Sequence, residues 1–260
     1  MRRFTILCLP LLAMAICTLS ASAREPGHRH TDRAFIDTSA PDDFIELRAY
    51  ALGGGSTITQ NYISCFPQIN QLNVSMGPAL GAGASAQFAL RDYIAIGTEF
   101  NLLINNYSTE MVVTSENVSS VSTIFLDYRY YTVNIPVFAS MRFNIARRVK
   151  WNVDLGLYYS YGLGGRNDQT IYDARINEIG QLVTRVDRDR VDYYNDRRSF
   201  ICSSGRGDLG LHLGTGLTFG NHFLLGARMQ LGFYNVAKTD GLTRPNIHNF
   251  AITVQAGYKF

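Results

Sequence analysis

Two stretches near the end of the chain alternate apolar residues with small or polar ones at a period of two. Apolar side chains occupy every second position from Phe223 to Phe233 and again from Phe250 to Phe260. This is the repeat of a β-strand, in which successive side chains point to opposite faces. Each apolar face is about as long as the roughly 9 to 11 residues with which a tilted strand crosses a bilayer. The pattern therefore predicts strands that span a membrane.

The beginning of the chain predicts export. Arg2 and Arg3 precede an apolar run, and Ala21-Ser22-Ala23 supplies small residues for cleavage, so residues 1–23 have the layout of a secretory signal peptide. Residues 24–43 have no period and are expected to form a flexible periplasmic lead. The remaining residues 44–260 are expected to form one domain, because all-β domains of this length are common.

Composition supports a barrel and argues against a polyanion partner. Without Arg2 and Arg3, the 24 basic residues fall to 22, against 21 acidic ones. The mature chain is thus nearly neutral, and no nucleic-acid partner is expected. Its 23 Gly, 15 Tyr and 15 Phe, with only 7 Pro, favour many strands with aromatic belts. Cys65 and Cys202 remain after signal removal and could form a disulfide in an exported protein.

Six more alternating stretches precede the last two, so about eight strands are expected. They cover residues 44–52, 80–88, 94–104, 131–143, 151–161 and 209–219. The connections after the second, fourth and sixth strands are short, and the others are long. Membrane barrels alternate in this way, with short periplasmic turns and long outer loops. The predicted fold is an all-β, eight-stranded antiparallel up-and-down transmembrane β-barrel.

Several local features carry expectations of their own. Gly53-Gly54-Gly55 is expected to end the first strand, and residues 107–127 to form a long loop or an extended hairpin. The charged insertion 164–205 is expected to contain a hairpin around residues 177–180. Pro136 lies inside a strand pattern and cannot donate a ladder hydrogen bond, so a bulge or a locally unpaired position is predicted there.

Alternation alone does not separate a membrane barrel from a soluble one, because only the direction of the apolar face differs. Aromatic residues gather at both ends of the apolar faces, as in membrane barrels. The opposite face carries charges, and a basic side chain facing midplane lipid costs about 2 to 4 kcal/mol. We therefore predict an interior polar network, and a plugged lumen, from Glu46, Arg48, Glu99, Arg142, Asp154, Asp208, His212, Arg228 and Lys259.

Glu46 and Lys259 are expected to meet where the first and last strands join, because both are inward residues near the periplasmic rim.

No catalytic, metal or cofactor site is predicted. An outer-membrane hydrolase or transferase needs a histidine near Ser, Asp or Asn at one rim. His212, His222 and His248 fall at different heights of the predicted barrel. His28 and His30 make an incomplete metal site. Three acidic residues could suggest calcium: Asp187, Asp189 and Asp192. Arginines are interleaved with them, which favours a solvated charged loop.

Three motifs carry a resemblance to a known family. Residues 131–143 contain Asn134-Ile135-Pro136-Val137 followed by Met141-Arg142-Phe143. Together with residues 214–235 and the ending Gly257-Tyr258-Lys259-Phe260, they resemble the PorT-like outer-membrane β-barrel family. The resemblance implies the barrel fold and, for some relatives, service to a protein secretion apparatus. Tyr258 and Phe260 resemble the terminal signal that barrel-assembly machinery is expected to read.

The sequence leads to a functional hypothesis with three alternatives. The protein is expected in the outer membrane of a Gram-negative bacterium, in contact with its lipid and with the barrel-assembly machinery. Its role is expected to be structural or surface-binding through the outer loops, on a rigid scaffold, with a protein partner at those loops or at the periplasmic face. The alternatives are a secretion component, an outer-membrane enzyme and a soluble exported barrel that binds an apolar ligand.

Overall fold

The computed structural model describes residues 34–41, 43–114, 120–146, 148–177, 179–195, 203–220, 222–238 and 244–260. The predicted signal peptide, residues 1–23, lies outside this range. The elements are β1 (Ile45–Gln60), α2 (Tyr62–Cys65), β2 (Ile69–Arg91), β3 (Ile94–Thr114), β4 (Ser120–Ala146), β5 (Val149–Ile176), β6 (Leu182–Asp192), β7 (Ser203–Ser204), β8 (Gly207–Phe219), β9 (Phe223–Gly232), β10 (Ala237–Lys238) and β11 (Ile247–Lys259). Among the described residues, no helix combines the length and apolar character required to span a bilayer.

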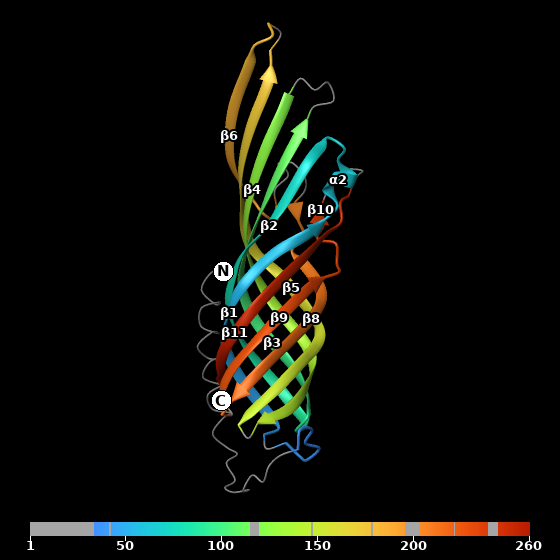
Figure 1. The fold of residues 1–260 in the computed structure, drawn as a ribbon, viewed down its shortest axis with the longest axis vertical. Helices are drawn as coiled ribbons and strands as arrows, with labels where there is room; N and C mark the ends of the chain where they lie inside the picture. The colour runs from blue at the N-terminus through green and yellow to red at the C-terminus, as the bar shows by residue number, and fades with distance from the viewer. Residues whose placement is uncertain are drawn as a thin grey trace, which may run out of the picture.

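Eight long strands close into a ring, which confirms the predicted fold class. Their order is β1, β2, β3, β4, β5, β8, β9 and β11, every neighbouring pair is antiparallel, and β11 returns to β1. Figure 1 shows these strands inclined around the long axis of the molecule. Because the ring is closed, its backbone groups are paired with neighbouring strands, as a membrane-spanning sheet requires.

The apolar face of every ring strand points outward. Leu102, Val137 and Leu155 are about half exposed, with relative exposures of 49%, 55% and 57%. Polar neighbours on the opposite face are buried, among them Asn101 and Asn134 at 2% each. A soluble ligand-binding barrel would have the reverse arrangement. The alternative of a soluble barrel therefore disagrees with the direction of the side chains.

Aromatic side chains border the exposed apolar band at both ends. On β5, Trp151 lies at the end near the short turns and Tyr161 lies ten positions further along. At 3.3 Å a residue and a tilt of about 40°, ten positions rise about 25 Å, which matches the apolar band of an outer-membrane barrel. The ends of this band locate the two membrane interfaces.

The sheet continues beyond the outer aromatic row. The upper parts of β3, β4 and β5 remain paired with one another, and β6 pairs with β5 from Arg166↔Asp192 to Ile176↔Leu182. Figure 1 shows β6 and its neighbours rising above the closed ring. The insertion thus contains the predicted hairpin, with its turn around Gly180, which has a positive φ of 80°. We call the parts of β2 to β6 above the ring the outer extension.

One expectation about where a strand ends is wrong, and one open choice between a loop and a hairpin is decided. Gly53-Gly54-Gly55 does not end β1, which continues to Gln60. A Cβ on Gly54 would lie 2.1 Å from the Ile252 carbonyl oxygen, so glycine here allows β1 and β11 to approach closely. Residues 107–127 are not a long loop but the extended hairpin that was the other option, formed by β3 and β4.

Pro136 lies at a locally unpaired position, as predicted. The register between β3 and β4 runs through Thr98↔Val137 and resumes at Asn101↔Asn134, without pairs in between. The Pro136 carbonyl still accepts a hydrogen bond from Thr98 Oγ1 at 3.0 Å. The missing proline N–H therefore interrupts the ladder with β3 without shifting its register.

Part of the expected flexible lead is attached to the barrel. The Phe35 ring stacks on Phe143 with centroids 5.1 Å apart, and the Asn144 N–H donates to the Phe35 carbonyl at 2.9 Å. The Asp92 N–H donates to the Ser39 carbonyl at 3.3 Å. The described part of the lead is thus held against the short turns at the periplasmic end.

Replacing Val137, near the middle of the lipid-facing band, tests the direction of the apolar face. Val137→Arg is expected to lower the free energy of unfolding by about 2 to 4 kcal/mol, because the charge would face midplane lipid. Val137→Leu is the matched control and should change it by less than about 1 kcal/mol. The measurement is denaturant unfolding in lipid vesicles, and an equal effect of both changes would contradict the assignment.

Candidate functional site

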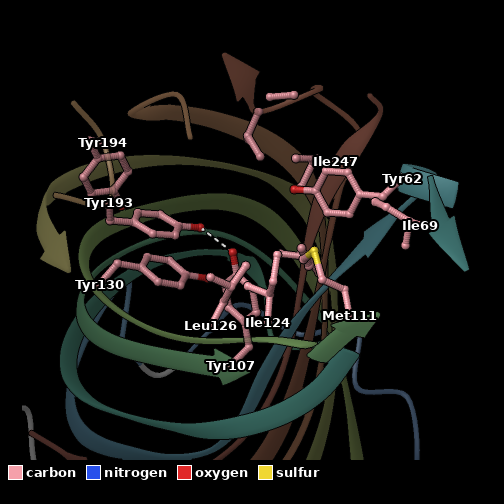
Figure 2. Close-up of a cluster of buried hydrophobic side chains, with 13 residues drawn as sticks. Tyr62, Ile69, Tyr107, Met111, Ile124, Leu126, Tyr130, Tyr193, Tyr194 and Ile247 are labelled. Atoms are coloured by element: carbon pink, nitrogen blue, oxygen red, sulfur yellow. Dashed lines mark hydrogen bonds between the residues drawn. The ribbon is translucent and has the colours of Figure 1, made fainter. Parts of the chain in front are cut away.

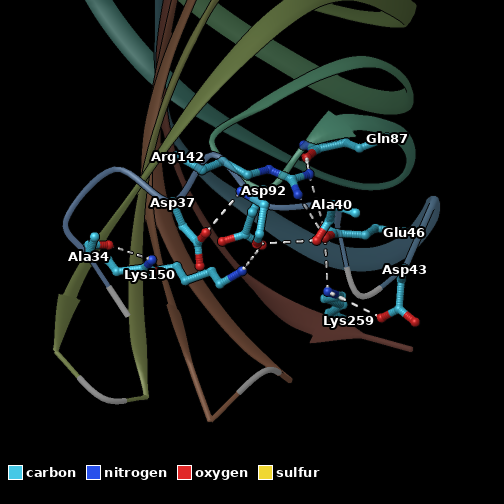
Figure 3. A network of polar contacts seen from close by, with 12 residues as sticks. Ala34, Asp37, Ala40, Asp43, Glu46, Gln87, Asp92, Arg142, Lys150 and Lys259 are labelled. Atoms are coloured by element: carbon cyan, nitrogen blue, oxygen red, sulfur yellow. Dashed lines mark hydrogen bonds and ion pairs between the residues drawn. The ribbon is translucent and has the colours of Figure 1, made fainter. Parts of the chain in front are cut away.

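A cluster of charged side chains lines the periplasmic end of the barrel around Glu46. Its carboxylate lies 2.9 Å from Arg48 Nη2, 2.7 Å from Arg142 Nη1 and 3.0 Å from Lys259 Nζ. Arg142 also donates to Gln87 Oε1 at 2.5 Å. Figure 3 shows Glu46, Arg142 and Lys259 converging from separate strands, with Lys150 and Asp92 in the same network. Lys150 Nζ lies 2.7 Å from Asp92 Oδ1. The expected contact between Glu46 and Lys259 is confirmed.

A second ion pair crosses the middle of the lumen. Glu99 on β3 accepts a hydrogen bond from Arg228 Nη2 on β9 at 2.6 Å. Because β3 and β9 are four places apart in a ring of eight, this pair joins opposite walls. Asn101 donates to the same carboxylate at 3.1 Å, and the Tyr50 hydroxyl donates to Asn101 at 2.9 Å. The Arg228 guanidinium also lies 4.3 Å from the centre of the Tyr50 ring.

The other predicted interior carboxylates have neutral partners. Asp154 accepts from Ser140 Oγ at 2.5 Å and from Asn152 Nδ2 at 2.9 Å. Asp208, nearer the outer end, accepts from the Tyr158 hydroxyl and from Asn249 Nδ2, both at 2.9 Å. Each carboxylate is therefore desolvated but hydrogen-bonded, which is how buried charges are tolerated.

His212 is fully buried, and its ring lies 5.4 Å from the Phe138 ring. Neither ring nitrogen has a hydrogen-bond partner within the described residues. The structure thus places His212 inside the barrel but does not connect it to the hydrogen-bonded carboxylates.

An apolar cluster of buried side chains lies above the polar interior, toward the outer end of the barrel. It comprises Ile58, Tyr62, Ile69, Tyr107, Met111, Ile124, Leu126, Tyr130, Tyr193, Tyr194, Val236, Ala237 and Ile247. Figure 2 shows these side chains gathered inside the rim. The Tyr193 ring stacks on Tyr130 at 4.6 Å, and its hydroxyl lies 3.2 Å from the Tyr107 hydroxyl. We call this set the outer cap.

The sequence analysis missed the outer cap. Its members come from the strand ends and from the segment after β6, which was assigned to a charged loop. Tyr193-Tyr194 directly after an Arg/Asp-rich run was the available signal, because adjacent aromatics are unusual in a fully solvated segment. Burial raises the pKa of the Tyr194 hydroxyl, so this part of the cap stays uncharged at neutral pH.

The candidate catalytic histidines lie in three separate environments. His212 is inside β8, His222 stacks on Tyr258 at the periplasmic end with centroids 5.2 Å apart, and His248 begins β11 at the outer end. No group of three or more His, Cys, Asp or Glu side chains within the described ranges could hold a metal ion. His28 and His30 lie outside those ranges.

Cys65 lies at the end of α2, with its Sγ 3.6 Å from Asn61 Oδ1, and forms no disulfide with another described residue. Cys202 lies outside the described residues, so the suggested pairing of the two cysteines stays a prediction. Tyr258 and Phe260 pack together at the periplasmic end of the band, with ring centroids 5.4 Å apart.

Comparison with known proteins agrees with this architecture. Residues 47–238 match the family described as "Outer membrane protein beta-barrel domain". No curated protein matches the chain.

Solved structures with related folds have low sequence identity to the chain. Ail of Yersinia pestis, in complex with the heparin analogue sucrose octasulfate, is 14% identical; the match covers 83% of this chain and 99% of Ail, with a TM-score of 0.35. Neisserial surface protein A is 11% identical over 84% of this chain and 98% of its own, with a TM-score of 0.34. OprG of Pseudomonas aeruginosa is 11% identical over 83% and 95%, with a TM-score of 0.39. At these scores the superpositions add nothing to the functional argument.

The importance of the cluster around Glu46 can be tested by neutralising the Glu46 carboxylate. Glu46→Gln removes the counter-ion that Arg48, Arg142 and Lys259 share, so the free energy of unfolding should fall by about 3 to 5 kcal/mol. The control is Asp187→Asn, which removes an exposed partner of Arg185 and should cost less than about 1 kcal/mol. Similar losses for both variants in vesicle-based unfolding would show that the cluster is not stabilising.

Proposed function

The chain belongs to the family of outer membrane protein beta-barrel domains, and from this premise we propose that it is a non-conducting barrel that presents a binding surface outside the cell. The observation that carries the proposal is the combination of a bridged lumen with strands that continue far beyond the membrane band. A pore would need an open lumen, and a purely membrane-embedded scaffold would not need strands that extend beyond the membrane.

The contacts across the lumen support a plugged interior. An eight-stranded barrel is narrow enough for side chains to fill. Here the pair Glu99–Arg228 joins opposite walls at 2.6 Å, and Asn134 and Gln230 exchange two hydrogen bonds, at 3.1 and 3.0 Å, between β4 and β9. The outer cap lies above them. Ions crossing this barrel would have to break buried ion pairs, each of which is costly to separate.

The outer extension supports a surface role. Strands held by continuous pairing form a rigid scaffold, and binding functions usually lie on the parts that such scaffolds display. The β6 side chains from Leu182 to Arg190 are all exposed. We therefore place the partner-binding surface on the outer extension and not in the lumen.

Several finer assignments are part of this proposal. Residues 1–23 are proposed to direct export, and Tyr258 and Phe260 to be read by the barrel-assembly machinery. The protein is proposed not to be an enzyme, and the separation of His212, His222 and His248 supports that assignment.

A role in a secretion apparatus is the second candidate. It is favoured by the likeness of Asn134-Ile135-Pro136-Val137 and of Gly257-Tyr258-Lys259-Phe260 to PorT-like barrels. Comparing the secreted proteins of a deletion strain with those of the parent distinguishes the two roles. Loss of specific cargo would favour secretion, and an unchanged set of secreted proteins would favour the surface role alone.

Conductance measurements test the plugged lumen. The purified protein in a planar lipid bilayer is expected to show no steady channel current, because ion pairs and the outer cap bridge its interior. A double variant, Glu99→Ala with Arg228→Ala, removes one bridge and should produce small, flickering currents if the fold is retained. Steady nanosiemens conductance of the unchanged protein would contradict a plugged interior.

Protease accessibility tests the orientation. Trypsin added to intact cells is expected to cut in the hairpin of β5 and β6, where Arg175, Arg185, Arg188 and Arg190 are exposed, while the ring strands stay protected. Replacing these four arginines with glutamine is the matched control and should prevent the cut in the hairpin. Cleavage only after the outer membrane is permeabilised would place the hairpin on the periplasmic side.

A further inference from the structure

The outward face of the outer extension carries an apolar patch. Cross-strand pairing places Val112, Thr123, Tyr172 and Val186 in one row across β3, β4, β5 and β6. Around this row lie six exposed large apolar side chains, which we call the outer patch: Val121, Phe125, Tyr172, Ile176, Leu182 and Val186. Leu182 is 69% exposed and Ile176 is 58% exposed. Three strands, β4 to β6, about 4.8 Å apart and about 20 Å of their length give a patch of roughly 300 Å², a size that often marks an interaction site.

Near its tip, the outer extension has polar contacts on its inner face and apolar side chains on its outward face. On the inner face, Ser122 donates to Asp173 at 2.8 Å, and Arg185 lies 3.7 Å from Asp187. The outward face of the same strands carries the outer patch. Strands in water with one apolar face normally turn that face toward a partner layer. The outer patch therefore lacks a partner layer within the described part of the chain.

A polar band separates the outer patch from the membrane. The next rows toward the barrel carry Asp127, Asp168 and Arg190, then Arg129 and Arg166. Asp168 pairs with Arg190, and Arg166 Nε lies 3.4 Å from Asp168 Oδ2. Lipid tails end below this band, so they do not reach the patch. The patch is therefore open to a protein surface that stands at the same height above the membrane.

We propose that the outer patch packs face to face against the outer patch of a second copy of this chain in the same membrane. The proposal rests on the proposed function, because it requires the outer extension to lie outside the cell. The patch continues the wall of the ring, so it faces sideways along the membrane. Two sheets packed about 10 Å apart would therefore set their barrels side by side in one bilayer.

Charge complementarity favours a second copy as the partner. A two-fold axis along the membrane normal that passes between β4 and β5 reverses the order of the strands β3 to β6, so β3 of one copy faces β6 of the other. The row Glu110, Phe125, Thr170 and Arg188 then lies opposite the same row of the second copy in reverse order. Glu110 of each copy therefore faces Arg188 of the other, which makes two such contacts. Both side chains are exposed, and neither makes an ion pair within the described residues. The adjoining row brings Val112 against Val186 of the second copy.

Edge pairing is the less favourable way to join two copies. The same two-fold axis would set the free edges of two β6 strands parallel, with each residue beside its own counterpart. Arg185, Asp187, Arg188 and Asp189 would each lie near a like charge, which disfavours the ladder. The face, and not the edge, is the surface that a second copy fits.

Fluorescence energy transfer between donor-labelled and acceptor-labelled full-length protein in lipid vesicles, measured over a series of protein-to-lipid ratios, tests the proposal. The unchanged protein is expected to dimerise. Glu110→Arg and Arg188→Glu should each weaken dimerisation about tenfold or more, because each places like charges in contact twice. The double variant Glu110→Arg with Arg188→Glu should return to within about threefold of the unchanged protein.

Two further variants complete the test. Val186→Asp places a charge in the patch on β6, opposite Val112 of the second copy, and should abolish energy transfer, whereas Ile179→Ser, at the hairpin turn outside the patch, should leave it unchanged. Heat-modifiable gel migration confirms that each variant folds. A monomer at every ratio, or failure of the double variant to recover, overturns the proposal. If the protein is monomeric, non-conducting and cut by trypsin from outside, only the dimer is overturned. If the hairpin is protected on intact cells, the surface role itself is overturned.

Discussion

Closure of the sheet between β1 and β11 is the constraint on which the rest of the structure depends. Hydrocarbon offers no hydrogen-bond partner to a free strand edge, so the ring must close within the membrane. Closure through Arg48↔Lys259 brings charges from both chain ends of the barrel together, and Glu46 lies between them. With eight strands the enclosed space is narrow, so each inward charge finds a partner on another wall or costs several kcal/mol. The ion pairs of the lumen are thus a consequence of ring closure.

The sequence predicted the strands well within the membrane, where one face of each strand meets lipid and the other meets the lumen. Between the two aromatic rows, outward positions must be apolar and inward positions small or polar, so strands such as β4 and β11 could be located from period two alone. Above the membrane both faces meet water, and Ser, Thr and Val occupy either side. There the two faces of a strand do not differ in polarity. The sequence therefore could not distinguish the outer parts of β1, beyond Gly53-Gly54-Gly55, and of β3 and β4 from loops. The strands were therefore predicted too short at their outer ends.

The sequence predicted which side chains of the site face the lumen, but not which of them pair with one another. Period two assigns Glu99 and Arg228 to the inward face, but their sequence separation gives no information on which wall each occupies. That pairing follows from the ring order, in which β3 and β9 are opposite. The outer cap was not predictable because its members, such as Tyr107 and Tyr193, come from distant segments that carry no common pattern. The described part of the lead escaped prediction for the same reason, since Phe35 stacks on a residue more than a hundred positions away.

The direction of the apolar face remains the central claim, and β4 offers the most direct measurement. A spin label placed at each position from Thr132 to Met141 in lipid vesicles reports collisions with lipid-dissolved oxygen. The account predicts high collision rates at odd positions, which include Val133, Ile135 and Val137, and low rates at even positions. The period should be two throughout. Equal rates at all positions, or high rates at the even positions, would contradict the account and with it the assignment of lumen and membrane faces.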